Sequence, residues 1–130
     1  MNAKELRLGN YIHPLLDKKE VAEICYIGEN DFGYERLSDK EYFQGNSIKP
    51  IPLTEEWLVK FGAELKKVVG MDNEYNLKLG EVEVSWDKKT GVTVFVLDTL
   101  ESFRVSYIKY VHQFQNFCFA LTNEELTTKQ

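Results

Sequence analysis

The sequence predicts an α+β fold, in which an antiparallel β meander packs with a C-terminal helix and a small curled antiparallel sheet precedes both. Three observations lead to this prediction. Short runs with period-two alternation follow one another between turn residues, a brief capped helix interrupts them, and the chain ends in a stretch with a strong helical apolar period. Consecutive short strands with few helices are typical of antiparallel sheets.

Residues 1–52 are expected to form the curled sheet. Its strands are predicted at Leu6 to Pro14 with a bulge at Gly9, Glu20 to Ile27 with packing on both faces, Phe32 to Leu37, and Ser47 to Ile51. This pattern suits an SH3-like barrel and an open sheet equally well.

A short helix is predicted within PIPLTEEWLVKFG, from Pro50 to Gly62. Thr54 is an N-cap candidate, Leu53 and Leu58 occupy the positions of a hydrophobic staple, and Gly62 suits the residue after the C-cap. The helix is expected to offer three side chains to the core, namely Trp57, Leu58 and Phe61.

The meander follows this helix. Apolar residues alternate with polar ones from Tyr75 to Leu79 and again from Val82 to Trp86. The two-residue loop between these runs, Gly80-Glu81, begins with a glycine, which indicates a type II′ turn. Val92 to Leu97 is apolar on both faces, as in a strand covered on two sides, and Phe103 to Tyr107 completes the sheet.

The C-terminal stretch from Tyr107 to Leu126 predicts a helix with two apolar stripes. At about 100° per residue, the wider stripe contains Tyr107, Val111, Phe114, Cys118 and Leu121, flanked by Tyr110 and Phe117. Val111 and Phe114 lie at its centre and are expected to be inaccessible. Asn123 suits the left-handed position that ends the helix.

The narrower stripe contains Ile108, His112, Gln115 and Phe119. Because it carries no carboxylate, it resembles the charge-depleted centre of a protein interface. Two interpretations remain open. Either the N-terminal half of the chain covers this stripe, or the stripe binds a partner, of which the simplest is a second copy in a symmetric homodimer.

Length and composition predict a single domain over residues 1–130, with an N-terminal subdomain at 1–52 and the remaining elements at 53–130. The net charge of -5 disfavours nucleic acid as the main partner, since phosphate binding needs clustered Lys and Arg. No apolar run approaches membrane-spanning length and no signal peptide is evident, so a cytoplasmic protein is expected.

Cys25 and Cys118 are expected to be buried free thiols. Together with His13 and His112 they do not have the spacing of a structural zinc site, so no metal is predicted. Because the chain also lacks phosphate-binding, dinucleotide-binding and nucleophile-elbow motifs, we expect neither a cofactor nor an enzymatic activity.

The chain contains three separated phrases, KELRLGNYI, IPLTEEWLVKFG and YVHQFQNFCFALTNEEL. It resembles a group of small uncharacterised proteins from Bacteroidota and their prophages and mobile elements. These proteins carry similar phrases in the same order, namely LRIGNYV, IPLTEEWLLKFGF and YVHQLQNLYFALTGEEL. It departs from them at Phe114, at Phe117-Cys118 and at Asn123. The resemblance implies a phage or mobile-element context and supplies no chemistry.

Two functions are compatible with these features. The first is a non-enzymatic accessory protein, an interaction module or inhibitor that binds a protein partner or itself. The second is a small-ligand binder, for example one that sequesters a nucleotide signal. Its ligand-binding side chains would be the clustered polar groups Lys109, His112, Gln113 and Asn116.

Overall fold

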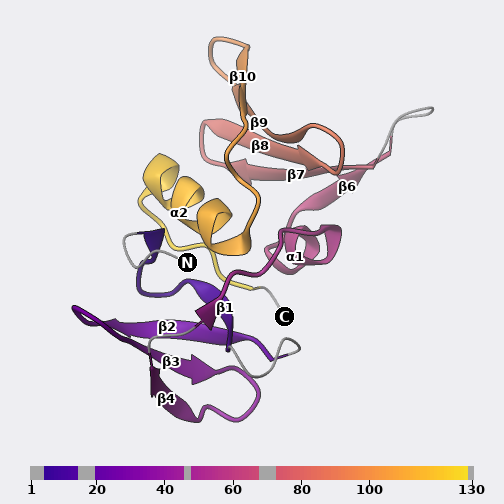
Figure 1. The fold of residues 1–130 in the computed structure, drawn as a ribbon. Helices are drawn as coiled ribbons and strands as arrows, with labels where there is room; N and C mark the ends of the chain where they lie inside the picture. Colours follow the sequence, from indigo (N-terminus) through magenta and orange to yellow (C-terminus); the bar gives the residue numbers. More distant parts are fainter. Residues whose placement is uncertain (1–4, 15–19, 46–47, 68–72, 129–130) are drawn as a thin grey trace. The chain divides into compact units, whose positions relative to one another are not determined.

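The computed structural model describes residues 5–14, 20–45, 48–67 and 73–128. These residues form an α+β fold with two five-stranded antiparallel sheets (Figure 1), which confirms the predicted fold class. The chain divides into two compact units, one formed by Met1–Pro52 with Tyr110–Phe117 and the other by Leu53–Lys109 with Cys118–Gln130. Whether the two units behave as a single domain stays a prediction.

The sheet of the first unit is curled like half a barrel and has the strand order β4-β3-β2-β1-β5. Its strands are β1 (Tyr11–Pro14), β2 (Ala22–Ile27), β3 (Phe32–Arg36), β4 (Tyr42–Gly45) and β5 (Ile48–Lys49). Apolar side chains from the N-terminal segment and four strands pack into one core, namely Leu6, Ile12, Ala22, Ile24, Phe32 and Ile48.

Three details of this sheet differ from the sequence prediction. Strand β1 begins at Tyr11 instead of Leu6, because Gly9 adopts a left-handed conformation with φ 93°. In β2, Ala22 and Ile24 are buried but Cys25 is exposed, so the strand packs on one face only and the predicted burial of this thiol is wrong. Strand β4 was not predicted, and Ser47 lies outside the described residues.

The second unit contains the meander, with strand order β10-β9-β8-β7-β6. Its strands are β6 (Glu64–Lys66), β7 (Glu74–Leu79), β8 (Val82–Asp87), β9 (Gly91–Val96) and β10 (Glu101–Val105). Leu79 pairs with Val82 across the predicted two-residue loop, in which Gly80 has φ 63° and Glu81 has a negative φ. A positive φ at the first loop residue alone is the feature that distinguishes a type II′ from a type I′ turn.

Register places one apolar row across four strands of this sheet. Leu77 pairs with Val84 and Val84 with Val94. Val94 in turn pairs with Phe103 on β10. Directly opposite residues share a face, yet Val94 is 0% exposed whereas Phe103 is 50% exposed. The covered face therefore becomes accessible at the β10 edge.

Helix α1 (Glu55–Lys60) begins after Thr54, which has the extended conformation of an N-cap, although its hydroxyl makes no capping hydrogen bond. The predicted staple residues Leu53 and Leu58 are both buried. Gly62 ends the helix at φ 94°, as expected. The three side chains predicted to enter the core, Trp57, Leu58 and Phe61, are buried.

Helix α2 (Val111–Thr122) starts four residues later than Tyr107, which is 58% exposed and does not belong to its apolar stripe. Tyr110 precedes the helix and forms a β-bridge with Pro52. Asn123 ends it at φ 60°, as predicted. None of the described helices is long and apolar enough to cross a membrane.

The wider stripe of α2 is confirmed as core at its centre, because Val111 and Phe114 are 0% exposed. We therefore predict that Phe114→Ala lowers the free energy of unfolding by about 3–5 kcal/mol, the usual loss for a buried phenylalanine. Urea denaturation measures this change. A loss below about 1 kcal/mol would contradict the assignment, since only surface positions tolerate truncation so well.

Candidate functional site

Gln115, a member of the narrower stripe, binds the backbone of the N-terminal segment. Its Oε1 accepts a hydrogen bond from the Tyr11 N–H at 2.8 Å, and its Nε2 donates to the Gly9 carbonyl at 3.0 Å. The side chain is 0% exposed. One buried amide thus makes the same pair of hydrogen bonds that a neighbouring strand makes.

The position of this amide follows from an incomplete strand pairing. On one side of the segment, the Gly9 N–H and the Asn10 carbonyl bond to Ile24 of β2. On the other side, β5 pairs with β1 only at His13 and Pro14. Gln115 occupies the side that β5 does not reach. The side chain therefore satisfies backbone groups that are costly to bury without partners.

Asn116 extends the same contact. Its Oδ1 accepts hydrogen bonds from Arg7 Nη1 and from Asn10 Nδ2, both at 2.8 Å. Its Nδ2 donates to the Glu5 carbonyl at 2.7 Å. Asn10 is itself 0% exposed and accepts the Arg7 N–H through Oδ1 at 2.7 Å. Both ends of the Asn116 amide are used within the chain, which leaves little capacity for a ligand.

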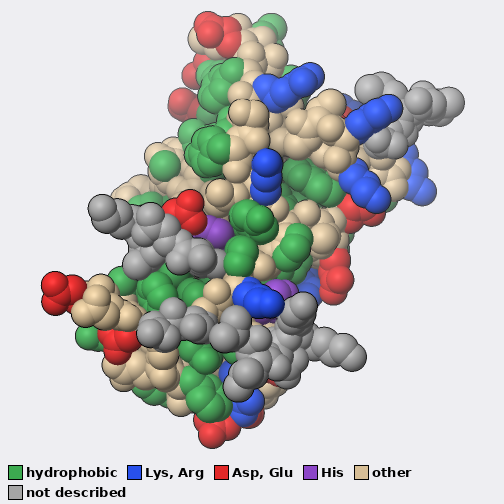
Figure 2. Space-filling model, viewed as in Figure 1, with side chains coloured by type: hydrophobic (Ala, Val, Ile, Leu, Met, Phe, Trp, Pro, Cys, Tyr) green, Lys and Arg blue, Asp and Glu red, His purple; other side chains and the backbone are tan. Residues whose placement is uncertain are grey.

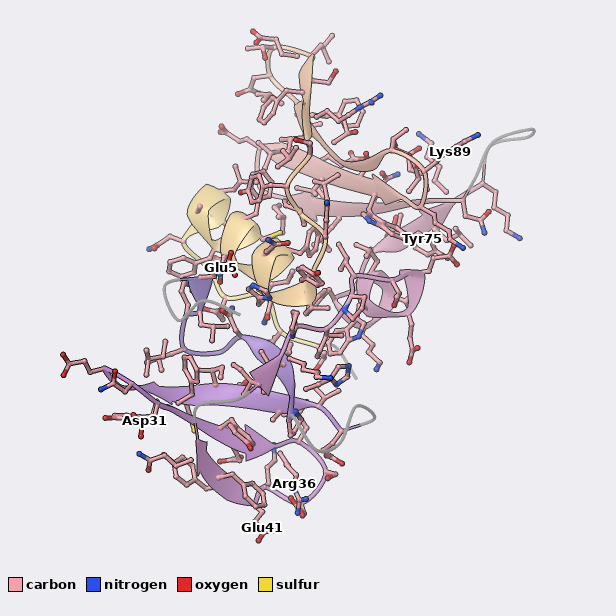
Figure 3. The ribbon with its side chains drawn as sticks, viewed as in Figure 1. Glu5, Asp31, Arg36, Glu41, Tyr75 and Lys89 are labelled. Carbon is pink, nitrogen blue, oxygen red and sulfur yellow. The ribbon has the colours of Figure 1, made fainter. Side chains whose placement is uncertain are left out.

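His112 is 1% exposed, and neither ring nitrogen has a hydrogen-bond partner among the described residues. The nearest carboxylate is that of Glu5, beside α2 in Figure 3, with Oε2 at 3.7 Å from Nε2. The Tyr110 ring stacks on the imidazole with centroids 6.0 Å apart. Burial lowers the pKa of His112 and outweighs the opposing effect of Glu5. The imidazole is therefore neutral near pH 7.

Of the remaining candidates, Gln113 contributes to the start of α2. Gln113 Oε1 accepts the Tyr110 N–H at 3.1 Å, as the third residue of a capping box does. Lys109 is exposed and belongs to the other compact unit. Ile108 is 5% exposed, so Phe119 is the one partly exposed member of the narrower stripe. Three members of the narrower stripe, Ile108, His112 and Gln115, are therefore buried within the chain itself.

Cys118 is buried, and burial raises the pKa of its thiol to about 12. The protonated thiol is a poor nucleophile at neutral pH. In the described part of the chain, His, Cys, Asp and Glu side chains form no group of three that could hold a metal ion.

The β9–β10 hairpin carries several exposed apolar side chains, among them Leu100, the most exposed of the large apolar residues described. Leu100 at its tip is 87% exposed, and Phe103, Phe95 and Leu97 are 50%, 37% and 37% exposed. Figure 2 shows hydrophobic and acidic groups gathered on this hairpin. This surface was not predicted, because the strand from Val92 to Leu97 has two apolar faces and was expected to be covered on both sides.

Leu100 also has an unusual backbone, with φ 58°. The left-handed conformation costs an L-residue about 1–2 kcal/mol, and glycine or asparagine is normally found there. The fold therefore gives no reason for leucine at this tip.

A groove of about 640 Å³ lies within the second unit, between the β7–β8 turn and the residues that follow α2. Its lining consists of Phe61, Leu77, Lys78, Leu79, Gly80, Glu81, Val82, Cys118, Leu121, Thr122, Glu124, Glu125 and Leu126. Leu121 was expected in the core but is 37% exposed, because it faces this groove.

Comparisons of the chain with protein-family models, with curated proteins and with solved structures each found no match. The function is therefore argued from the geometry of these surfaces.

We predict that Gln115→Ala lowers the free energy of unfolding by about 2–4 kcal/mol, because it removes two hydrogen bonds from buried backbone groups. Hydrogen exchange should accelerate most at the Tyr11 amide. Gln44→Ala, on the exposed β4 edge, is the matched control and removes only a solvent-exposed hydrogen bond to Asp31. It should change stability by less than about 0.5 kcal/mol. Equal effects of the two variants would show that the Gln115 amide does not hold this segment.

A second prediction concerns pH. The unfolded chain binds a proton at His112 near its ordinary pKa of 6.5, whereas the folded chain binds it only at lower pH. Stability supplied by the neutral buried imidazole is therefore complete above the unfolded pKa and is lost as the pH falls from that value through the lower pKa of the folded chain. Urea denaturation at about pH 7.5 and about pH 5.5 should show this loss in the native chain.

His112→Asn should reduce the difference in stability between the two pH values. The same measurement on His13→Asn separates the two histidines. An undiminished pH dependence in His112→Asn would contradict the assignment.

Proposed function

We propose that this chain is a non-enzymatic protein-interaction module that binds a protein partner through the β9–β10 hairpin. The accessory role in a phage or mobile element rests on the resemblance of its three phrases. The observation that supports binding is Leu100, an exposed leucine in a conformation that favours glycine. A side chain that costs folding energy and contributes no packing is best explained by a contact outside the chain.

The neighbouring side chains add to this argument. Phe103 continues a buried row of the sheet into solvent, and the exposed Leu97 belongs to the same hairpin. Phe95, which pairs with Ser102, is exposed on the opposite face of this hairpin. Exposed apolar groups that cluster on one element are typical of protein-binding surfaces, whereas isolated ones are ordinary. Aromatic side chains are enriched in the centres of such surfaces.

The residues of α2 favour this function over ligand binding or catalysis. Asn116 and Gln115 are engaged with the N-terminal segment. His112 is buried, and the Cys118 thiol is protonated at neutral pH. Of the polar groups first considered for a ligand site, Asn116 and Gln113 are therefore bonded within the chain, and His112 is buried.

The function predicts that Leu100→Gly separates binding from stability. Glycine adopts the left-handed conformation without the steric cost of leucine, so the variant should melt at or above the temperature of the native chain. A photo-crosslinking residue at Phe103, introduced in cells that naturally carry the gene, should form a discrete protein adduct. Leu100→Gly should abolish this adduct.

Val59 on α1 provides the control position, because it is 56% exposed and lies outside the hairpin. Identical adducts from Phe103 and Val59 would refute a hairpin interface. An adduct of twice the chain mass would identify the partner as a second copy. A large fall in melting temperature for Leu100→Gly would show that leucine serves the fold.

A further inference from the structure

The groove of the second unit has an apolar floor and an acidic rim. Phe61 and Leu126 at its floor are 0% and 8% exposed, and the more open Leu121 continues the apolar surface. Among the described lining residues, three carboxylates (Glu81, Glu124 and Glu125) stand against one ammonium group, that of Lys78. With one elementary charge on each, the rim carries a net charge of 1 − 3 = −2.

The groove is continuous with the hairpin. The Leu97 N–H donates to the Glu81 carbonyl at 3.0 Å, so the rim of the groove touches the base of the β9–β10 turn. Val82, which lines the groove, pairs with Val96, and Val96 pairs with Glu101. One face of the sheet therefore leads from the groove to the exposed edge that carries Phe103.

Because the groove and the hairpin are continuous, the surface suits a macromolecular partner better than a small ligand. A compact ligand fills a pocket of about 300–1,000 Å³ and needs little surface outside it. Here the face of the sheet that borders the groove continues to β10, where Phe103 is half exposed and the exposed Glu101 adds a further carboxylate. An elongated ligand with one apolar face and basic flanks matches both parts.

We infer that a basic amphipathic segment of a protein partner docks along this groove. The inference rests on the proposed interaction function and assigns the chemical class of the partner. Apolar side chains from one face of the segment cover Leu121 and the groove floor, and its Lys or Arg side chains pair with Glu81 and Glu124. Helices with an apolar stripe and basic flanks bind grooves in this way, and the opposite charges accelerate association.

Two labelled peptides of about 18 residues test the inference, both composed of leucine and lysine. One has the amphipathic helical period, and the other has the same residues permuted so that no apolar face forms. Fluorescence anisotropy with the full chain measures both affinities. The amphipathic peptide should bind with a dissociation constant at least about tenfold lower than that of the permuted peptide.

Charge reversal locates the site. Glu81→Lys with Glu124→Lys should weaken the amphipathic peptide at least about tenfold, and the corresponding pair of Gln substitutions should weaken it less. Glu29→Lys with Glu64→Lys makes the same change in net charge at two exposed positions outside the groove. This control should alter affinity by less than about twofold. Thermal melting of each variant confirms folding.

No measurable binding, equal binding of the permuted peptide, or an equal loss in the control pair overturns the inference. The last two results would mean that net charge alone attracts the peptide. The crosslinking experiment at Phe103 is independent of the peptide experiment. A specific adduct together with a failed peptide test would reject the basic segment and retain the interaction function, whereas loss of both would reject the function itself.

Discussion

The first unit depends on one side-chain amide that takes the place of a strand. Gln115 bonds the Tyr11 N–H and the Gly9 carbonyl on the side of the chain that β5 does not reach. The segment from Glu5 to Asn10 precedes β1 and bonds to β2 through Gly9 and Asn10, and Leu6 and Asn10 are buried. Gln115 and Asn116 together supply the hydrogen bonds that make this burial possible.

This constraint explains why polar residues lie on a buried helix face. A buried glutamine or asparagine is unfavourable unless both ends of its amide are bonded. Here the partners are backbone groups and the side chains of Arg7 and Asn10, so the amides are specific to this arrangement and not interchangeable with leucine. Asn116, which looks like part of a ligand site in the sequence, therefore stabilises the fold.

Much of the fold follows from local sequence rules. The β7–β8 hairpin, the ends of α1 and the C-terminal Asn123 were predicted because each depends on a few adjacent residues. Strands β4 and β6 were missed, since they contain only four and three residues and lie at sheet edges. Alternation is too short there to be recognised.

The site was less predictable, because its determinants are not local. The bond between Tyr11 and Gln115 joins residues 104 positions apart, and nothing in the helical period reveals it. Leu100 was missed for a different reason, since its exposure depends on β10 being an edge strand. The hydrophobic pattern of a sequence indicates which face of a strand is apolar, but the order of the strands in the sheet determines which apolar residues remain exposed.

The first unit is built from two segments that are far apart in the sequence, and this affects how the chain folds while it is being synthesised. Its sheet lies within the first 52 residues, but the segment that completes its hydrogen bonds is Tyr110–Phe117, which includes the first half of α2. Translation at about 5–20 residues per second therefore separates the emergence of Tyr11 from that of Gln115 by roughly 5–20 s. During this interval the N-terminal sheet is present on the ribosome without its final partner, and the intervening meander is released in time to fold first.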